Sequence, residues 1–293
     1  MARRQITITI RHLLPGLWLA ATLTSCAAIT PRHDWENRLR GDAIVLLGEI
    51  HDNAEHHRQR LEIVRRAFSA GWRPAIAMEQ FDRERQTDID RARRERPHDA
   101  QHVINLAGLS ASARNNWHWD SYRPFVELAL EYGVPLIAAN LSNADISKVV
   151  RGGLPAVFDA ESMQALGFSV PISPALQAAQ ERGIDIGHCS ALPPHILPAM
   201  ARGQLARDAV MASIAGKHAA QGLVLLAGNG HVRRDIGMPR WLSSAQRART
   251  LAVGFLEHDN ASAAGTSFDA VVRTTAAERL DPCVEFKKRL KPP

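Results

Sequence analysis

The stretch Ile44-Val-Leu-Leu-Gly-Glu-Ile-His51 has a counterpart far along the chain, Leu223-Val-Leu-Leu-Ala-Gly-Asn-Gly-His231. In each, a short run of aliphatic residues leads into the pattern Gly-x-x-His. Aliphatic runs bounded by glycine are typical of strands that are buried on both faces, and such strands belong to parallel sheets. Because parallel sheets bind ligands beyond the carboxyl ends of their strands, we expect both histidines to face one crevice.

Strands and helices alternate around these two segments. A helix that we expect Asp52 to cap carries Leu61, Val64 and Phe68 at helical spacing, and a strand follows it. The expected strands are 43–47, 74–78, 134–140, 223–226, 250–256 and 268–274, and the expected helices include 82–96, 122–132 and 199–220. This alternation is the pattern of right-handed parallel crossovers. We therefore predict an α/β fold with a mainly parallel β-sheet flanked by helices.

The pattern changes between the third and fourth strands. Residues 141–207 contain Gly152-Gly153, Pro193-Pro194 and further prolines between short helical stretches, with no convincing strand. We therefore predict a smaller all-helical subdomain inserted into the α/β domain. The predicted organisation is a polar linker over 27–41, an α/β domain made of 42–140 and 208–293, and a helical insertion over 141–207.

The amino end is similar to a bacterial lipoprotein signal. Basic residues precede an apolar stretch over 13–23, which closes with Leu23-Thr-Ser-Cys26. The resemblance implies that 1–26 is a lipoprotein signal peptide ending at a lipidated Cys26, which anchors the rest of the chain to a membrane. Ala27 follows in place of Asp, which implies an outer-membrane lipoprotein, periplasm-facing or surface-exposed. An uncleaved membrane helix is the alternative, but the stretch is far shorter than the ~20 residues that span a bilayer.

Two cysteines remain once Cys26 is assigned to the anchor. An exported protein lies in an oxidising compartment, so Cys189 and Cys283 can pair in a disulfide. The alternative is two unrelated buried thiols.

The composition fits a folded domain with an arginine-rich surface. The chain has 293 residues, of which 45% are hydrophobic, so it can bury a substantial core. Its net charge of +6 comes almost entirely from arginine, which suits carboxylate and phosphate groups. No nucleic-acid-binding module is recognisable, so we expect an exposed charged face and no nucleic-acid partner.

Polar side chains follow four of the predicted strands. These side chains are Glu49 and His51, Glu79 and Gln80, Asn140, and Asn229 and His231. Because they lie on one edge of a parallel sheet, we expect them to converge. Imidazole and carboxylate groups suit zinc or manganese, and Glu49 or Glu79 could activate water for hydrolysis beside a histidine. The alternative is that Glu49 and His51 only cap the following helix.

A second candidate site is the segment Trp117-His-Trp-Asp-Ser-Tyr122-Arg-Pro. Ferric haem takes a tyrosinate or histidine as axial ligand, prefers apolar and aromatic walls, and carries propionates that pair with arginine. Tyr122 is therefore the candidate iron ligand, Trp119 a candidate wall, and Arg114 and Arg123 candidate propionate partners. The alternative is that Tyr122 and the tryptophans only pack in the core.

Several motifs together resemble the ChaN-type haem-binding lipoproteins. They are Gly48-Glu-Ile-His51-Asp-Asn, Ala77-Met-Glu79-Gln-Phe, Trp119-Asp-Ser-Tyr122, Ile137-Ala-Ala-Asn140, Gln204-Leu-Ala-Arg-Asp208-Ala-Val-Met211-Ala and Gly228-Asn-Gly-His231-Val-Arg-x-Asp235-x-Gly-x-Pro239. They occur in the order of that family and cover about residues 40–245. The resemblance implies a parallel sheet with a small all-helical domain, and haem held in a dimer that encloses two stacked haems with tyrosine as the iron ligand.

The same superfamily includes Tiki-type metalloproteases and erythromycin-esterase-like enzymes, so the resemblance implies two functions. The leading hypothesis is a lipid-anchored haem-binding protein for haem or iron acquisition or storage. It would form a homodimer on binding haem, exchange haem with a receptor or uptake machinery, and use Tyr122, Trp119, Arg114, Arg123 and Asn140 around the cofactor. The alternative is a metal-dependent hydrolase, protease or esterase-like, that binds zinc or manganese and uses Glu49, His51, Glu79 and His231. A third reading is an anchored scaffold whose cluster is structural.

Overall fold

The computed structural model describes residues 33–39, 43–108, 117–258 and 266–290. The predicted signal peptide, most of the predicted linker and Arg114 lie outside these described residues. The first described element is a short 3-10 helix, η1 (Asp34–Arg38).

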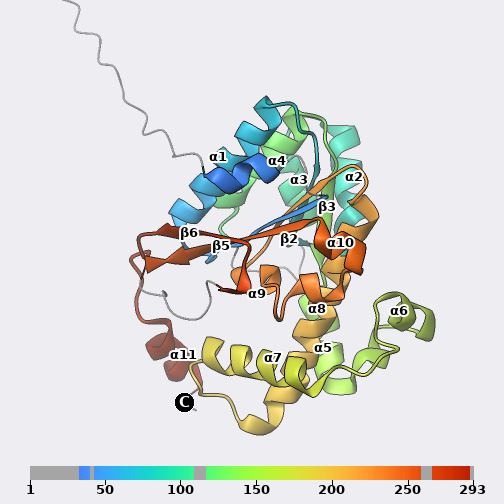
Figure 1. Cartoon of the computed structure of the whole chain (residues 1–293), viewed down its shortest axis with the longest axis vertical. Coiled ribbons are helices and arrows are strands. Elements are labelled where there is room, and N and C mark those ends of the chain that lie inside the picture. Colours follow the sequence, from blue (N-terminus) through green and yellow to red (C-terminus); the bar gives the residue numbers. More distant parts are fainter. Residues whose placement is uncertain (1–32, 40–42, 109–116, 259–265, 291–293) are drawn as a thin grey trace, which may run out of the picture. The chain divides into compact units, whose positions relative to one another are not determined.

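Six parallel strands form one sheet in the order β3-β2-β4-β1-β5-β6 (Figure 1). They are β1 (Ile44–Leu47), β2 (Ala75–Asp82), β3 (Leu136–Asn140), β4 (Leu223–Leu226), β5 (Thr250–Glu257) and β6 (Ala270–Thr274). β1 lies in the middle, and its Leu47 is in register with Leu226 of β4 and Val253 of β5. The predicted α/β fold with a mainly parallel sheet is therefore confirmed.

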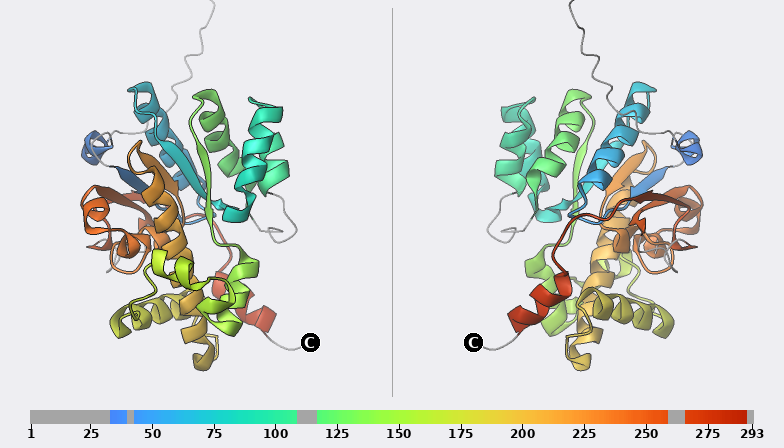
Figure 2. Two further views of the ribbon diagram at one scale, coloured as in Figure 1. Left: turned by 90° about the vertical axis from the view of Figure 1, so that its right-hand side faces the viewer. Right: turned by 90° about the vertical axis from the view of Figure 1, so that its left-hand side faces the viewer.

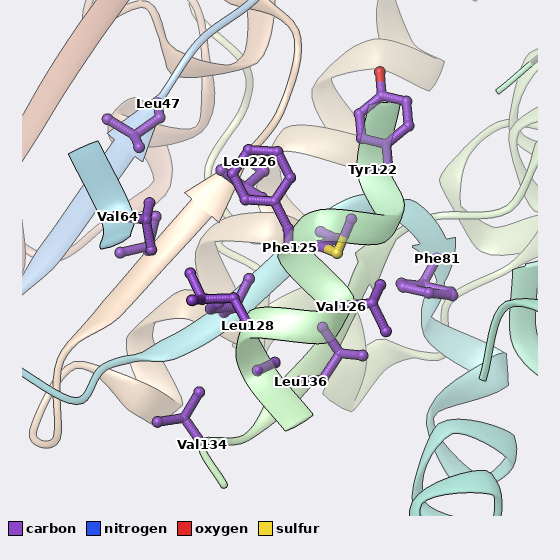
Figure 3. Close-up of a cluster of buried hydrophobic side chains, with 14 of the residues drawn as sticks. Leu47, Val64, Phe81, Tyr122, Phe125, Val126, Leu128, Val134, Leu136 and Leu226 are labelled. Atoms are coloured by element: carbon purple, nitrogen blue, oxygen red, sulfur yellow. The ribbon is translucent and has the colours of Figure 1, made fainter. Parts of the chain in front are cut away.

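One face of the sheet is covered by α1 (Ala54–Ser69), α2 (Gln86–Glu95), α3 (Ala100–Val103) and α4 (Trp119–Glu131). Because alternate strand residues point to opposite faces, Leu47 and Leu226 turn toward these helices and join a cluster with Phe125. Figure 3 shows Phe125 beside Leu226, with Tyr122 one turn earlier on α4. Burying each such side chain stabilises the fold by roughly 1.5–3 kcal/mol.

The other face packs against α8 (Leu197–His218) and the segment after β4. That segment contains α9 (Asn229–Val232), η7 (Met238–Trp241) and α10 (Ser244–Ala248). Ile44 and Leu46 of β1 meet Met211 of α8 and Met238 in this second cluster. Thus β1 and β2 continue into helices on one face, whereas β4, which lies between them, continues onto the other.

Between β3 and β4 the described chain is helical. It forms α5 (Asn143–Gly152), η5 (Leu154–Ala156), α6 (Ala160–Ala165), α7 (Pro174–Gly187) and η6 (Pro194–Ile196) before α8. These elements gather beyond the carboxyl edge of the sheet around a small core that includes Val149, Phe158 and Val210 (Figure 1). A disulfide joins Cys189, after α7, to Cys283 in the last helix, α11 (Pro282–Leu290), and Figure 2 shows α11 beside this helical region.

Two local expectations differ from the structure. The α1 N-cap is Asn53, whose side chain accepts bonds from the amides of Glu55 and His56, while Asp52 instead pairs with Arg279. β2 does not end at residue 78 but continues through Glu79 to Asp82, because its neighbour β3 still pairs with it at Asn140. The helix expected over 82–96 therefore starts later, with η2 (Arg83–Arg85) and then α2. None of the described helices is long and apolar enough to cross a membrane.

Candidate functional site

The site lies where β4 separates β1 from β2 at the carboxyl edge of the sheet. Strands that lead to opposite faces meet here, which is the usual ligand position in open α/β sheets. The structure brings together Glu49, His51, Glu79 and His231, which the sequence predicted to converge. Gly228 links them: its amide donates to Glu79 Oε2 at 2.8 Å, and a Cβ on it would lie 3.0 Å from His51 Nε2.

Glu49 is buried within a set of hydrogen-bond donors from α1 and α4. Its Oε1 accepts bonds from the Tyr122 hydroxyl at 2.6 Å and from His51 Nδ1 at 2.7 Å. Its Oε2 pairs with the guanidinium of Arg60, which is itself fully buried. Burial lowers the pKa of Arg60 to about 10, so the guanidinium stays charged at neutral pH and neutralises Glu49. The negative charge of the Glu49 carboxylate is therefore compensated in the core.

His57 completes this arrangement from α1. Its Nε2 donates to the backbone carbonyl of His51 at 2.9 Å, which leaves Nδ1 to accept from Arg60 at 3.2 Å. We assign the Nε2 tautomer from these two partners. Burial lowers the pKa of His57, and the neutral ring fixes the loop that carries His51.

His51 is the open member of the cluster. Because its Nδ1 donates to Glu49, its Nε2 carries a lone pair, and its side chain is 47% exposed. Burial lowers the pKa of His51. The positive charge of His231 also lowers this pKa, and the carboxylate of Glu79 raises it by less than burial lowers it. Trp117 contacts the ring edge-on, with centroids 4.8 Å apart. A neutral imidazole held by a carboxylate through one nitrogen, with the other nitrogen free, is the form that binds metal centres.

His231 lies in the opposite environment, buried between two carboxylates. Its Nδ1 bonds Asp208 Oδ1 at 2.6 Å, and its Nε2 lies 3.5 Å from Glu79 Oε1. Burial alone would lower the pKa of His231. The negative charges of Glu79 and Asp208 nevertheless raise this pKa to about 9. Burial would raise the pKa of Glu79, yet the positive charge of His231 holds it below its usual value. His231 is therefore an internal cation at neutral pH.

The sequence reasoning gave no role to Arg60, Asp208 or Gln204. Asp208 also accepts a bond from Gln180 at 3.2 Å, and Gln204 contacts His231 Nε2 at 3.1 Å. A local signal existed for Arg60, since it stands three residues before Ile63 on the buried stripe of α1. A cation on an apolar stripe indicates a buried partner.

Tyr122 is fully buried, and its hydroxyl is turned to Glu49 rather than to solvent. Burial raises the pKa of Tyr122, which disfavours the phenolate that binds ferric iron. Trp119 packs against Phe81 with ring centroids 5.0 Å apart. In this structure both are part of the core under the site.

The other predicted haem contacts are spread apart. Arg123 pairs with Asp120 at 3.2 Å on the surface of α4. Asn140 is buried at the end of β3, and its amide donates to Asp82 at 3.1 Å. Arg207, which the prediction did not include, faces the cluster from α8 and bonds Asn143 at 3.1 Å, and its charge contributes to the pKa of His51 and of Glu79.

Several buried polar atoms around the site lack hydrogen-bond partners within the described parts of the chain. They include Nε1 of Trp117, which contacts His51, and Nε of Arg207. Buried polar atoms are seldom left unpaired, so this group indicates a place for water or a polar ligand.

The zinc or manganese alternative has no support in this geometry. Across the described ranges, no three His, Cys, Asp or Glu side chains are placed to hold a metal ion. The physical reason is that the candidate ligands are already engaged. Glu49 is taken by Arg60, Glu79 by the Gly228 amide, and His231 by Asp208.

The architecture and the carboxyl-edge cluster define an α/β protein with a candidate ligand site at the end of its parallel sheet. A family model described as haem-binding uptake, Tiki superfamily, ChaN, matches residues 35–242, which is more than half of the sequence. The chain therefore belongs to the ChaN family of haem-binding uptake proteins, and the resemblance predicted from its motifs is confirmed.

Two solved structures are similar to the chain, and the first of them shares its fold. The ChaN protein of Campylobacter jejuni, solved with cofacially bound haem, is 21% identical with a TM-score of 0.61, over 76% of this chain and 84% of that one. A mutant of the erythromycin esterase EreC in its open conformation is 15% identical with a TM-score of 0.45, over 75% and 71%. The second likeness is too distant to carry an argument. No curated protein matches the chain by sequence.

Proposed function

We propose that this chain binds haem at the carboxyl edge of the sheet, with Nε2 of His51 as the iron ligand. The observation that carries the proposal is the state of His51, a neutral, half-exposed imidazole whose Nδ1 is held by the buried carboxylate of Glu49. Membership of the ChaN family and the haem-bound relative from Campylobacter jejuni support haem as the bound group.

The surrounding residues fit a haem group. Haem supplies a ferric iron with axial positions for protein ligands, an apolar ring and two carboxylates. Gly228 leaves the neighbourhood of His51 Nε2 free of a side chain, and Trp117 supplies an aromatic wall. Arg207, with one buried nitrogen still unpaired among the described residues, is a partner for a propionate.

Tyr122 remains the rival iron ligand, as the sequence predicted. Its burial and its bond to Glu49 favour a positioning role instead. Together with Arg60, the phenol fixes the carboxylate that in turn orients His51. The two assignments differ in which substitution removes the iron ligand.

The test is a titration of the purified protein with hemin, followed by the Soret band. His51→Ala should weaken binding by more than the about 10–100-fold that changes in outer-shell partners produce. Tyr122→Phe should keep the wild-type Soret position with a smaller loss of affinity. His98→Ala, which removes an exposed histidine elsewhere, is the matched control.

Each failure has a distinct meaning. Normal binding by His51→Ala with loss of the Soret shift in Tyr122→Phe would make Tyr122 the ligand. No saturable shift in the wild-type protein would end the haem proposal itself.

We further propose that the protein is anchored through Cys26 to the bacterial outer membrane and serves haem or iron acquisition or storage. The sequence of residues 1–26 and the uptake role named for the family support this. Capture of haem by a homodimer and exchange with a receptor or uptake machinery belong to the same proposal. Cys26→Ser should abolish labelling by radioactive palmitate and release the protein from the membrane fraction. Unchanged labelling of that variant would overturn the anchor.

A further inference from the structure

The last part of the described chain passes the loop that carries His51 on its way from the sheet to the helical region. Residues 275–281, here called the carboxyl-terminal strap, lie between β6 and α11 and form no helix or strand (Figure 1). Beyond the strap, Cys283 of α11 is joined to Cys189 by the disulfide. The strap is therefore held at one end by the sheet and at the other by a covalent bond to the helical region.

Arg279, in the strap, bonds two carboxylates at once. Its Nε and Nη2 donate to the two oxygens of Asp52 at 2.7 and 3.0 Å, and its Nη1 donates to Glu257 Oε2 at 2.8 Å. Asp52 directly follows His51 in the sequence, and Glu257 ends β5. Two parallel bonds between a guanidinium and a carboxylate fix orientation as well as distance. Arg279 therefore joins the loop that carries His51 to the end of a strand.

Asn53 connects the same loop to the strap by a second set of bonds. Its side-chain oxygen caps α1, and its side-chain amide donates to Glu257 Oε1 at 2.7 Å and to the carbonyl of Thr275 at 3.0 Å. The backbone amide of Ala277 also donates to Glu257 Oε1, at 2.9 Å. The loop is thus held by the strap as well as by His57 of α1.

The disulfide keeps the strap beside the loop. The side chains of Arg279 and Asp52 are 27% and 47% exposed, and an exposed ion pair alone contributes little to stability. Cys283 lies only four residues after Arg279. Its covalent bond to Cys189 therefore limits how far the guanidinium can move from Asp52 and raises its effective concentration there. The position of the loop depends on the disulfide as well as on the ion pair.

We infer that Arg279 is a positioning residue for the haem ligand His51, and that the Cys189–Cys283 disulfide regulates haem binding through the strap. This inference rests on the proposed function, in which Nε2 of His51 binds the iron. A dithiol reductant would break the S–S bond, leave a thiol on each cysteine and itself become a disulfide. The freed strap would then hold the loop less firmly, and haem would bind more weakly.

The first test needs no haem. Hydrogen exchange of the haem-free full chain is followed by mass spectrometry in a peptide that covers 50–56. Arg279→Gln should exchange faster than the wild type in this peptide. Arg279→Lys, which keeps the charge but not the planar fork, should be intermediate. Arg273→Gln, which removes an exposed arginine of β6, is the matched control and should exchange as the wild type does.

The second test is titration with hemin. Arg279→Gln should raise the hemin Kd about tenfold, as changes in outer-shell partners do, and keep the wild-type Soret position because His51 remains the ligand. Arg279→Lys should recover part of the affinity. The double variant Cys189→Ser, Cys283→Ser should raise the Kd by less than Arg279→Gln does. Protein reduced with dithiothreitol, and freed of it under anaerobic conditions before the titration, should match the double variant.

The outcomes separate this inference from the proposed function. Wild-type hemin binding by Arg279→Gln, with binding lost in His51→Ala, would overturn the positioning role alone. Unchanged exchange over 50–56 in Arg279→Gln, with a lowered urea midpoint, would reduce Arg279 to a structural residue. Equal hemin affinity of the double cysteine variant and the wild type would overturn the regulation. No saturable Soret shift in the wild type would overturn both proposals.

Discussion

The two Gly-x-x-His segments end matched neighbouring strands, yet their histidines are in opposite electrostatic states. The side chain of His51 is 47% exposed and its pKa is lowered, whereas that of His231 is 6% exposed and its pKa is raised. The same local motif therefore supplies an open neutral imidazole at β1 and a buried cation at β4. The difference arises from the helices that pack against each strand end.

At β1 the helix α1 supplies a cation. Arg60 neutralises Glu49, so His51 can donate to that carboxylate without carrying a charge of its own. At β4 the helix α8 supplies a second acid, Asp208. Glu79 and Asp208 both have His231 as their ion partner, so the His231 imidazole is protonated and acts as their counterion. One histidine thus keeps an exposed, neutral ring, and the other joins α8 to the end of β4 through an ion pair.

The largest expected effect comes from removing the cation at β1. Arg60→Met should leave Glu49 buried without its counterion and lower the free energy of unfolding by about 3–5 kcal/mol. Urea denaturation at pH 7 measures this loss. Arg58→Met, on the exposed face of the same helix, should cost only about 0–1 kcal/mol.

A double substitution separates charge from packing. Glu49→Gln in the Arg60→Met background removes the orphaned carboxylate and should recover part of the lost stability. If Arg60→Met and Arg58→Met lowered the free energy of unfolding by equally small amounts, Arg60 would not be the cation that compensates Glu49. The proposed difference between the two strand ends would then be wrong.

The strands and their terminal side chains could be predicted because their signals are local. Aliphatic runs mark β1 and β4, and the polar residues that follow them are Glu49, His51 and His231. The approach of His231 to Glu79 could not be predicted in the same way. It depends on β4 entering the sheet between β1 and β2, and no local pattern gives that strand order.

The environment of Tyr122 illustrates a weaker local signal. The aromatic and arginine residues beside it in the sequence made it the predicted iron ligand. However, Phe125, Val126 and Ala129 continue from it at helical spacing, and all of them are buried with it on one side of α4. That stripe predicts an inward-facing residue, and its hydroxyl then needs the partner that it finds in Glu49.

The smaller expected effect is a pair of pH dependences with opposite signs. The pKa of His231 is raised from 6.5 to about 9, so its contribution is complete below pH 6.5 and is lost as the pH rises through 9. This loss should be on the order of 3 kcal/mol of unfolding free energy between pH 6 and pH 9.5. The pKa of His51 is lowered, so its contribution is lost as the pH falls below 6.5, where the unfolded chain takes up the proton.

Urea denaturation across this pH range distinguishes the two histidines. Asp208→Asn removes one of the two carboxylates that raise the pKa of His231, so the alkaline loss should shrink and should be complete at a lower pH. His51→Gln should leave the alkaline loss unchanged and reduce only the acid one, to which His56 and His57 also contribute because their pKa values are lowered too. An alkaline loss of the same size in Asp208→Asn and wild type would mean that His231 is not the internal cation. The two strand ends would then differ in exposure alone.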